Sequence, residues 1–121
     1  MKRNASNYER NLLRKLWDCG FVAFRIAGSG SSSYPSADII AIKNEKVYVF
    51  EVKTTRSEKI YINPSQMWEL ERIRESGVKI FIAVRFINKL REWRFIDFSI
   101  LENNKISLEF AKERGIKLED L

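Results

Sequence analysis

The chain has 121 residues, 45% of them apolar and 31% charged, and this composition indicates one soluble domain, residues 1–121, long enough to bury a core. The absence of histidine excludes Ser-His-Asp and Cys-His nucleophile systems and His-ligated zinc, so hydrolysis would need carboxylates, lysine and a metal ion. The single cysteine, Cys19, has no disulfide partner, which suits the cytoplasm, and no apolar run is long enough to cross a membrane. The net charge of +6 favours a polyanionic partner or simply solubility, and charge alone does not separate the two.

The first half of the chain predicts one helix and three strands. An amphipathic helix begins at Ser6, which forms a capping-box pattern with Glu9, and ends at Gly20. Residues 21–26, 37–42 and 47–53 are rich in β-branched and aromatic side chains, which predicts three strands. An irregular Gly/Ser-rich loop, residues 28–36, separates the first two of them.

The second half predicts two helices and two more strands. Asn63 followed by Pro64 marks the start of a helix that runs to about residue 76, and a short helix over residues 107–114 ends at Gly115. Residues 78–86 and 92–98 are the two strands. The order of elements predicts an α/β fold with a central mixed five-stranded sheet flanked by helices.

The second and third predicted strands bring acidic side chains together. If Asn44-Glu45 forms a two-residue hairpin turn, the register places Asp38 directly opposite Glu51. Opposed side chains have Cβ atoms about 4.5–5.5 Å apart, where like charges destabilise the sheet unless a cation lies between them. Because side chains alternate between the faces of a strand, Lys53 shares the face of Glu51. The surrounding residues 39–42 and 47–50 are apolar and are expected to be buried on both faces.

This trio of charges predicts a metal site with a basic group beside it. Two carboxylates are hard oxygen ligands that suit Mg²⁺, and an adjacent ammonium can orient an attacking water or stabilise developing charge. The alternative is that Asp38 and Glu51 are strand-end charges facing solvent, with Lys53 as their salt-bridge partner. The apolar hairpin favours the metal site, because charges at the end of a buried hairpin are costly without a function.

Asp38 and the Glu51-Val52-Lys53 triplet resemble the signature of the PD-(D/E)XK nuclease superfamily, which includes many restriction endonucleases. Within it, the chain is similar to archaeal Holliday junction resolvases of the Hjc type. Two features depart from the pattern: Pro35 does not directly precede Asp38, and the 28–36 loop is Ser-rich where relatives often carry basic residues. The similarity covers nearly the whole chain, including Tyr8-Glu9-Arg10, Gly20-Phe21, residues 25–29 and 38–41, and Trp93-Arg94-Phe95-Ile96.

The resemblance implies a restriction-endonuclease-like fold and a Mg²⁺-dependent endonuclease that resolves four-way DNA junctions by paired nicks in strands of like polarity. It implies that Asp38, Glu51 and the carbonyl of Val52 bind Mg²⁺, for which Mn²⁺ can substitute. Glu9 would reach the outer shell of the metal, and Lys53 would assist the water nucleophile.

The resemblance also implies the partners. Relatives act as two-fold homodimers, so a homodimer on junction DNA is expected, with no small-molecule cofactor and no membrane. Arg10 and Arg25 would hold phosphates near the scissile bond, and Ser29 would contact the junction backbone at the active site. Further phosphate contacts are expected from Arg56, Lys59 and Arg85.

The residues themselves leave alternatives open. Glu9 can serve only to close the capping box, Ser29 can belong to a flexible loop, and the basic side chains can be solvated surface charges. The alternative functions are a restriction-like or repair nuclease acting on duplex or flap DNA, and a catalytically inactive module that binds branched DNA. The intact carboxylates and lysine argue against the inactive module.

Overall fold

The computed structural model of the chain describes residues 5–27 and 33–121, with side chains described from residue 7 onward in the first segment. A mixed six-stranded sheet has the order β1-β2-β3-β5-β6-β8, and β4 and β7 form a separate two-stranded sheet. β3 and β5 pair in parallel, and the other described pairings are antiparallel. The elements are α1 (Ala5–Asp18), β1 (Val22–Arg25), β2 (Ile39–Lys43), β3 (Lys46–Thr55), β4 (Lys59–Tyr61), α2 (Pro64–Arg74), β5 (Lys79–Phe86), β6 (Arg94–Asp97), β7 (Lys105–Ser107), α3 (Leu108–Arg114) and β8 (Ile116–Lys117).

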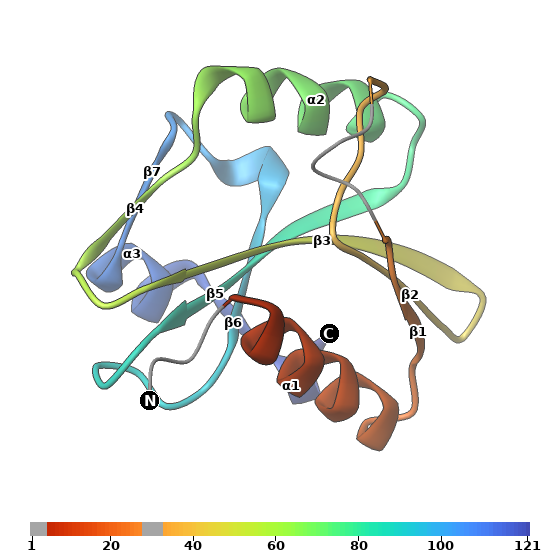
Figure 1. Ribbon diagram of the computed structural model, residues 1–121, viewed down its shortest axis with the longest axis horizontal. Coiled ribbons are helices and arrows are strands. Elements are labelled where there is room, and N and C mark those ends of the chain that lie inside the picture. Colours follow the sequence, from red (N-terminus) through yellow and green to blue (C-terminus); the bar gives the residue numbers. More distant parts are fainter. Residues whose placement is uncertain (1–4, 28–32) are drawn as a thin grey trace.

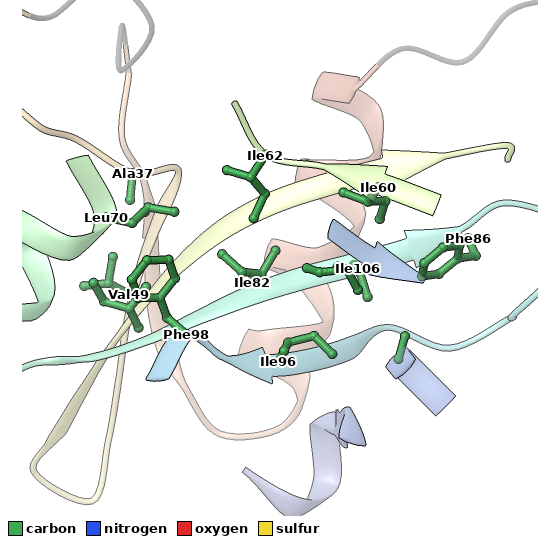
Figure 2. Close-up of a cluster of buried hydrophobic side chains, with 13 residues drawn as sticks. Ala37, Val49, Ile60, Ile62, Leu70, Ile82, Phe86, Ile96, Phe98 and Ile106 are labelled. Atoms are coloured by element: carbon green, nitrogen blue, oxygen red, sulfur yellow. The ribbon is translucent and has the colours of Figure 1, made fainter. Parts of the chain in front are cut away.

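The two faces of the main sheet carry different cores. α1 lies on one side of the sheet and α2 on the other (Figure 1). On the α1 side, Leu12 and Leu16 pack with buried aromatic rings, among them Phe50, Phe81 and Phe95. The other core is mostly aliphatic, and Figure 2 shows Ile60 and Ile106, from the β4-β7 pair, beside Ile82 and Ile96 of the main sheet.

The predicted hairpin between β2 and β3 is confirmed with its register. Asn44 and Glu45 form the turn, and both have positive φ, at 52° and 68°. This is the backbone of a type I′ turn, whose twist matches that of the flanking strands. Lys43 pairs with Lys46 and Ile39 with Phe50. The turn therefore sets the face on which every side chain of β3 lies.

All five predicted strands form, but the main sheet has six strands because β8 adds an edge beside β6. β4, β7 and β8 are two or three residues long, too short for the alternation that identifies a strand in sequence. Ile60 and Ile106 are buried and pair across β4 and β7. These strands therefore depend on the tertiary core rather than on a local pattern.

Two local predictions are wrong. The described helix α1 already includes Ala5, so Ser6 does not occupy the N-cap position that a capping box requires. The hairpin is not buried on both faces along its length, because Ile42 is 38% exposed and Val47 is 40% exposed near the turn. An apolar run in sequence does not reveal how far other elements will cover it. Among the described residues, no helix combines the length and apolarity needed to cross a membrane.

Candidate active site

Asp38 is fixed by its backbone and its side chain where the chain enters β2. Its N–H donates to the carbonyl of Phe50 at 3.1 Å, and its carbonyl accepts from the N–H of Ile26 at 2.8 Å. Its Oδ2 atom accepts a hydrogen bond from the backbone N–H of Val52 at 2.8 Å. The aspartate therefore joins the end of β1 to the middle of β3, and its carboxylate is held over the Glu51-Val52 backbone.

Glu51 is the residue that the hairpin register predicts beside Asp38, and the structure brings the two together. The ladder ends with the pair Ile39 and Phe50, one step before Asp38 and Glu51. A hydrogen bond joins the two acidic side chains. Two carboxyl groups can share such a bond only when one of them carries a proton. The predicted acidic pair is thus confirmed in position.

Burial makes the charge of Glu51 costly. The residue is 7% exposed, and in the described part of the chain it is the one charged residue that is buried. Burial, followed by the negative charge of Asp38, raises the pKa of the Glu51 carboxyl to about 8, and the charge of Lys53 opposes this rise only in part. Two carboxylates that cannot both ionise without help are a donor set that a divalent cation satisfies. The residues present therefore fit the metal that the sequence predicts.

Lys53 lies on the same face of β3, as predicted, but it does not form a close ion pair with Glu51. Its Nζ atom is 3.8 Å from Oε2 of Glu51. The side chain of Gln66, in the first turn of α2, connects the two: its Oε1 accepts from Lys53 Nζ at 2.7 Å, and its Nε2 donates to Glu51 Oε2 at 3.2 Å. Gln66 was not among the predicted site residues. Its one signal in the sequence is its place in the first turn of a helix, which does not show that its side chain reaches β3.

Glu9 and Arg25 approach from the α1 side. Arg25 Nε donates to Glu9 Oε1 at 3.2 Å, and both side chains are partly exposed. Burial, and then the charge of Asp38, raise the pKa of Glu9, while Arg25 opposes the rise. The field of Asp38 thus reaches Glu9. Among the described residues, however, no three acidic or other metal-ligating side chains gather closely enough to hold an ion. Asp38 and Glu51 alone make up the carboxylate pair, and Glu9 lies outside it.

The other predicted DNA contacts are spread over the surface. Arg10 is exposed on α1 and donates to Asn7 Oδ1 at 2.6 Å. Arg56 and Lys59 are exposed at the connection from β3 to β4. Arg85 pairs with Thr54 and donates to the carbonyl of Leu90 at 3.2 Å, which braces the turn after β5. The flanking residues Val84 and Phe86 point to the aliphatic core, so Arg85 lies on the opposite sheet face from Glu51. Ser29 lies outside the described residues.

The whole chain is similar in sequence and in fold to known proteins. The sequence matches the family described as "Archaeal holliday junction resolvase (hjc)" over residues 1–121. It is 33% identical to the crossover junction endodeoxyribonuclease Hjc of Archaeoglobus fulgidus over 106 residues, which cover 87% of this chain and 76% of the relative. It is 37% identical over 131 residues to the Hjc of Sulfurisphaera tokodaii, covering 99% and 86% of the two chains. The crystal structure of Archaeoglobus fulgidus Hjc, a Holliday junction resolvase, matches with a TM-score of 0.83 at 31% identity, over 93% of this chain and 94% of that one.

Proposed function

Because the chain belongs to the archaeal Holliday junction resolvase (Hjc) family, we propose that it is a nuclease domain, residues 1–121, that hydrolyses phosphodiester bonds in four-way DNA junctions. The observation that carries the proposal is the buried carboxyl pair of Asp38 and Glu51 with the ammonium of Lys53 beside it. Nuclease chemistry accounts for this costly arrangement. The two carboxylates can bind a divalent cation, and the ammonium can interact with the phosphate of the substrate.

Asp38 and Glu51, with the backbone carbonyl of Val52, would hold Mg²⁺, and Mn²⁺ would substitute for it. When bound, such an ion lowers the pKa of a water molecule and stabilises negative charge on the phosphate. Two carboxylates are enough, since Mg²⁺ is usually held by one or two of them and takes further oxygens from water and phosphate. The hydrogen bond from the N–H of Val52 to Asp38 Oδ2 holds this carboxylate beside Glu51.

The remaining charged groups would act on the DNA. Lys53 has N–H groups beyond the one given to Gln66, and these can orient the attacking water or donate to a phosphate oxygen. Arg25 and Arg10 would hold phosphates next to the scissile bond, a role that the planar fork of a guanidinium suits. Glu9 positions Arg25 through their ion pair and would act from the outer shell of the metal.

Resolution of a junction requires two cuts, so we propose that the chain acts as a homodimer with two-fold symmetry. Each chain supplies one set of Asp38, Glu51 and Lys53, and a closed two-fold dimer supplies two sets at a fixed separation. The two nicks would fall in strands of like polarity, as the symmetry of the junction requires. Because its substrate is DNA, the chain would work in the cytoplasm of an archaeal cell.

The function is tested by incubating the chain with Mg²⁺ and three DNA substrates of matched sequence: a four-way junction, a flap and a linear duplex. We expect cleavage of the junction and little of the other two. Equal cutting of the duplex or flap would indicate a repair or restriction-like nuclease, and binding without cleavage would indicate an inactive module.

The homodimer is tested on a supercoiled plasmid that extrudes a cruciform. Mixed dimers of active and Asp38→Asn chains should accumulate nicked circles, because each mixed dimer has one working site. Mixed dimers that linearise the plasmid as fast as the parent, or a monomer in sedimentation with junction bound, would contradict paired cutting.

A further inference from the structure

Gln66 is a polar residue on the face of α2 that packs on the sheet. It precedes the buried Leu70 by four residues and the half-buried Ile73 by seven, so the three side chains lie on one stripe of the helix. The N-cap fixes its backbone, because Asn63 Oδ1 accepts the N–H of Gln66 at 2.8 Å and Pro64 follows Asn63 in the first turn. The side chain of Gln66 is therefore directed at the face of β3 that carries Glu51 and Lys53.

The chemistry of the two partners fixes the orientation of the amide. A lysine ammonium can only donate, so the amide oxygen of Gln66 must face Lys53 and its amide nitrogen then faces Glu51. A primary amide is uncharged and offers both a donor and an acceptor in one plane. Its two hydrogen bonds measure 2.7 and 3.2 Å.

The amide changes the relation between the two charges. A direct ammonium–carboxylate hydrogen bond is typically about 2.7–2.9 Å long, whereas Lys53 Nζ and Glu51 Oε2 are 3.8 Å apart. In a close ion pair, one carboxylate oxygen of Glu51 would accept a hydrogen bond from Lys53, and one N–H group of Lys53 would be taken up by that bond. With Gln66 between them, each charged group has a neutral hydrogen-bond partner. The other oxygen of Glu51 and the other N–H groups of Lys53 can then interact with a metal ion or with the substrate.

We propose that Gln66 is a positioning residue, which holds the Lys53 ammonium apart from the Glu51 carboxylate. Glu51 can then bind a metal ion, and Lys53 can orient the attacking water or donate to a phosphate oxygen. The inference rests on the proposed nuclease function and deepens it. α2 lies on one side of the sheet (Figure 1), and the two hydrogen bonds of Gln66 connect this helix to Glu51 and Lys53 of β3.

The test compares the full-length wild-type chain with Gln66→Met, which keeps nearly the same length and loses both hydrogen bonds. Ser65→Ala is the matched control, because Ser65 lies next to Gln66 in the same turn and donates to Asn63 rather than to the site. A third variant, Gln66→Glu, keeps an acceptor for Lys53 and loses the donor to Glu51. The readouts are kcat and KM on junction DNA, Mn²⁺ binding to the DNA-free chain by calorimetry, and the melting temperature.

For Gln66→Met we expect kcat and Mn²⁺ affinity to fall by about 10–100-fold, the usual cost of removing a group that orients a metal ligand. KM, junction affinity and melting temperature should stay at the wild-type values, and Ser65→Ala should match the wild type in all readouts. Gln66→Glu should lose kcat at least as strongly as Gln66→Met, because a second carboxylate cannot donate to Glu51. A purely structural role would instead lower the melting temperature and junction affinity together.

Two failures are distinguishable. A wild-type chain that leaves junctions uncut would overturn the proposed function. If the wild type cuts junctions and Gln66→Met shows the same kcat and Mn²⁺ affinity, the role of Gln66 is overturned and the function stands. A fall in kcat that is accompanied by a lower melting temperature and weaker junction binding would also overturn the positioning role.

Discussion

Two acidic side chains of this protein, Glu51 on β3 and Glu71 on α2, each lie near a basic partner, and their environments act on them in opposite directions. Arg74 donates twice to the exposed Glu71, at 2.6 Å in both bonds, and these hydrogen bonds lower the pKa of Glu71. Burial and Asp38 raise the pKa of Glu51 to about 8 although Lys53 is near. The surface pair satisfies its own charges, whereas the buried group is left with a charge that it cannot carry alone.

The difference separates a surface ion pair from a binding site. Exposed pairs of this kind contribute little to stability and need no explanation beyond solvation. A buried acidic pair that opposes folding is retained where a ligand compensates it, which for two carboxylates is a cation. Single substitutions in the buried group, in the basic residues expected to bind DNA and in the surface pair test this difference.

The largest effect is expected from removing the buried charges. Asp38→Asn, Glu51→Gln and Lys53→Ala should each reduce junction cleavage on the order of a thousandfold, because each removes a metal ligand or the ammonium beside it. Junction binding should persist in the two acid variants, or tighten as repulsion of phosphate falls. Gel-based cleavage and binding assays check this. Cleavage at the parental rate in an acid variant would remove that residue from the site.

The next effect is a change in how stability depends on pH. The carboxyl of Glu51 has a pKa of about 8 in the folded chain against an ordinary value of 4.5, so the folded state holds a proton that the unfolded state releases. The free energy of unfolding of the metal-free wild type should therefore fall as the pH rises from about 4.5 to about 8. In Glu51→Gln this fall should be smaller, and the variant should be the more stable protein at pH 8.

Urea unfolding with a chelator present, at about pH 5 and at pH 8, measures this difference. Parallel pH dependences in the wild type and in Glu51→Gln would mean that Glu51 is ionised at no cost and that the contrast with Glu71 is absent.

A smaller effect is expected in the salt dependence of junction binding. Arg10→Ala and Arg25→Ala should each make the log–log slope of affinity against salt shallower by about one, the effect of losing one phosphate contact. The same titration decides the three remaining expectations, Arg56, Lys59 and Arg85. An unchanged slope would remove the residue concerned from the DNA surface. For Arg85, the structure already offers another role in its bond to Leu90.

The smallest effect is expected at the surface pair. Glu71→Gln and Arg74→Gln should leave cleavage, Mn²⁺ affinity and the unfolding midpoint nearly unchanged, because the two side chains form an ion pair at the surface that is open to solvent. A clear loss of activity in either variant would show that the outer part of α2 takes part in catalysis or in binding DNA.

The sequence predicts the acidic pair because a two-residue turn determines the whole register of a hairpin. Once Asn44 and Glu45 form that turn, Asp38 and Glu51 must come together. Gln66 could not be predicted in the same way, since its contact depends on how the crossover from β3 through α2 to β5 is placed over the sheet. β4 and β7 were missed for a related reason: their single buried isoleucines, Ile60 and Ile106, pair only within the folded core.

Sequence patterns were least informative about exposure. The apolar run of the hairpin predicts burial on both faces, yet Ile42 and Val47 are exposed near the turn. The position of Arg85 shows the same limit, because its charge suggests a phosphate contact and its face of the sheet depends on the parallel pairing of β3 with β5. In both cases the sequence correctly predicts the strand, but the exposure of a side chain and the sheet face on which it lies depend on neighbouring elements.

The central claim is that Asp38 and Glu51 form a site whose missing charge is a divalent cation. The most direct measurement is the melting temperature of the DNA-free chain at pH 8, with and without Mg²⁺, for the wild type and for Asp38→Asn. An ion that binds only the folded state stabilises it, so the wild type should melt at a higher temperature with Mg²⁺ and the variant should show no shift. A wild type that does not respond to Mg²⁺, or a variant that gains as much as the wild type, would contradict the account.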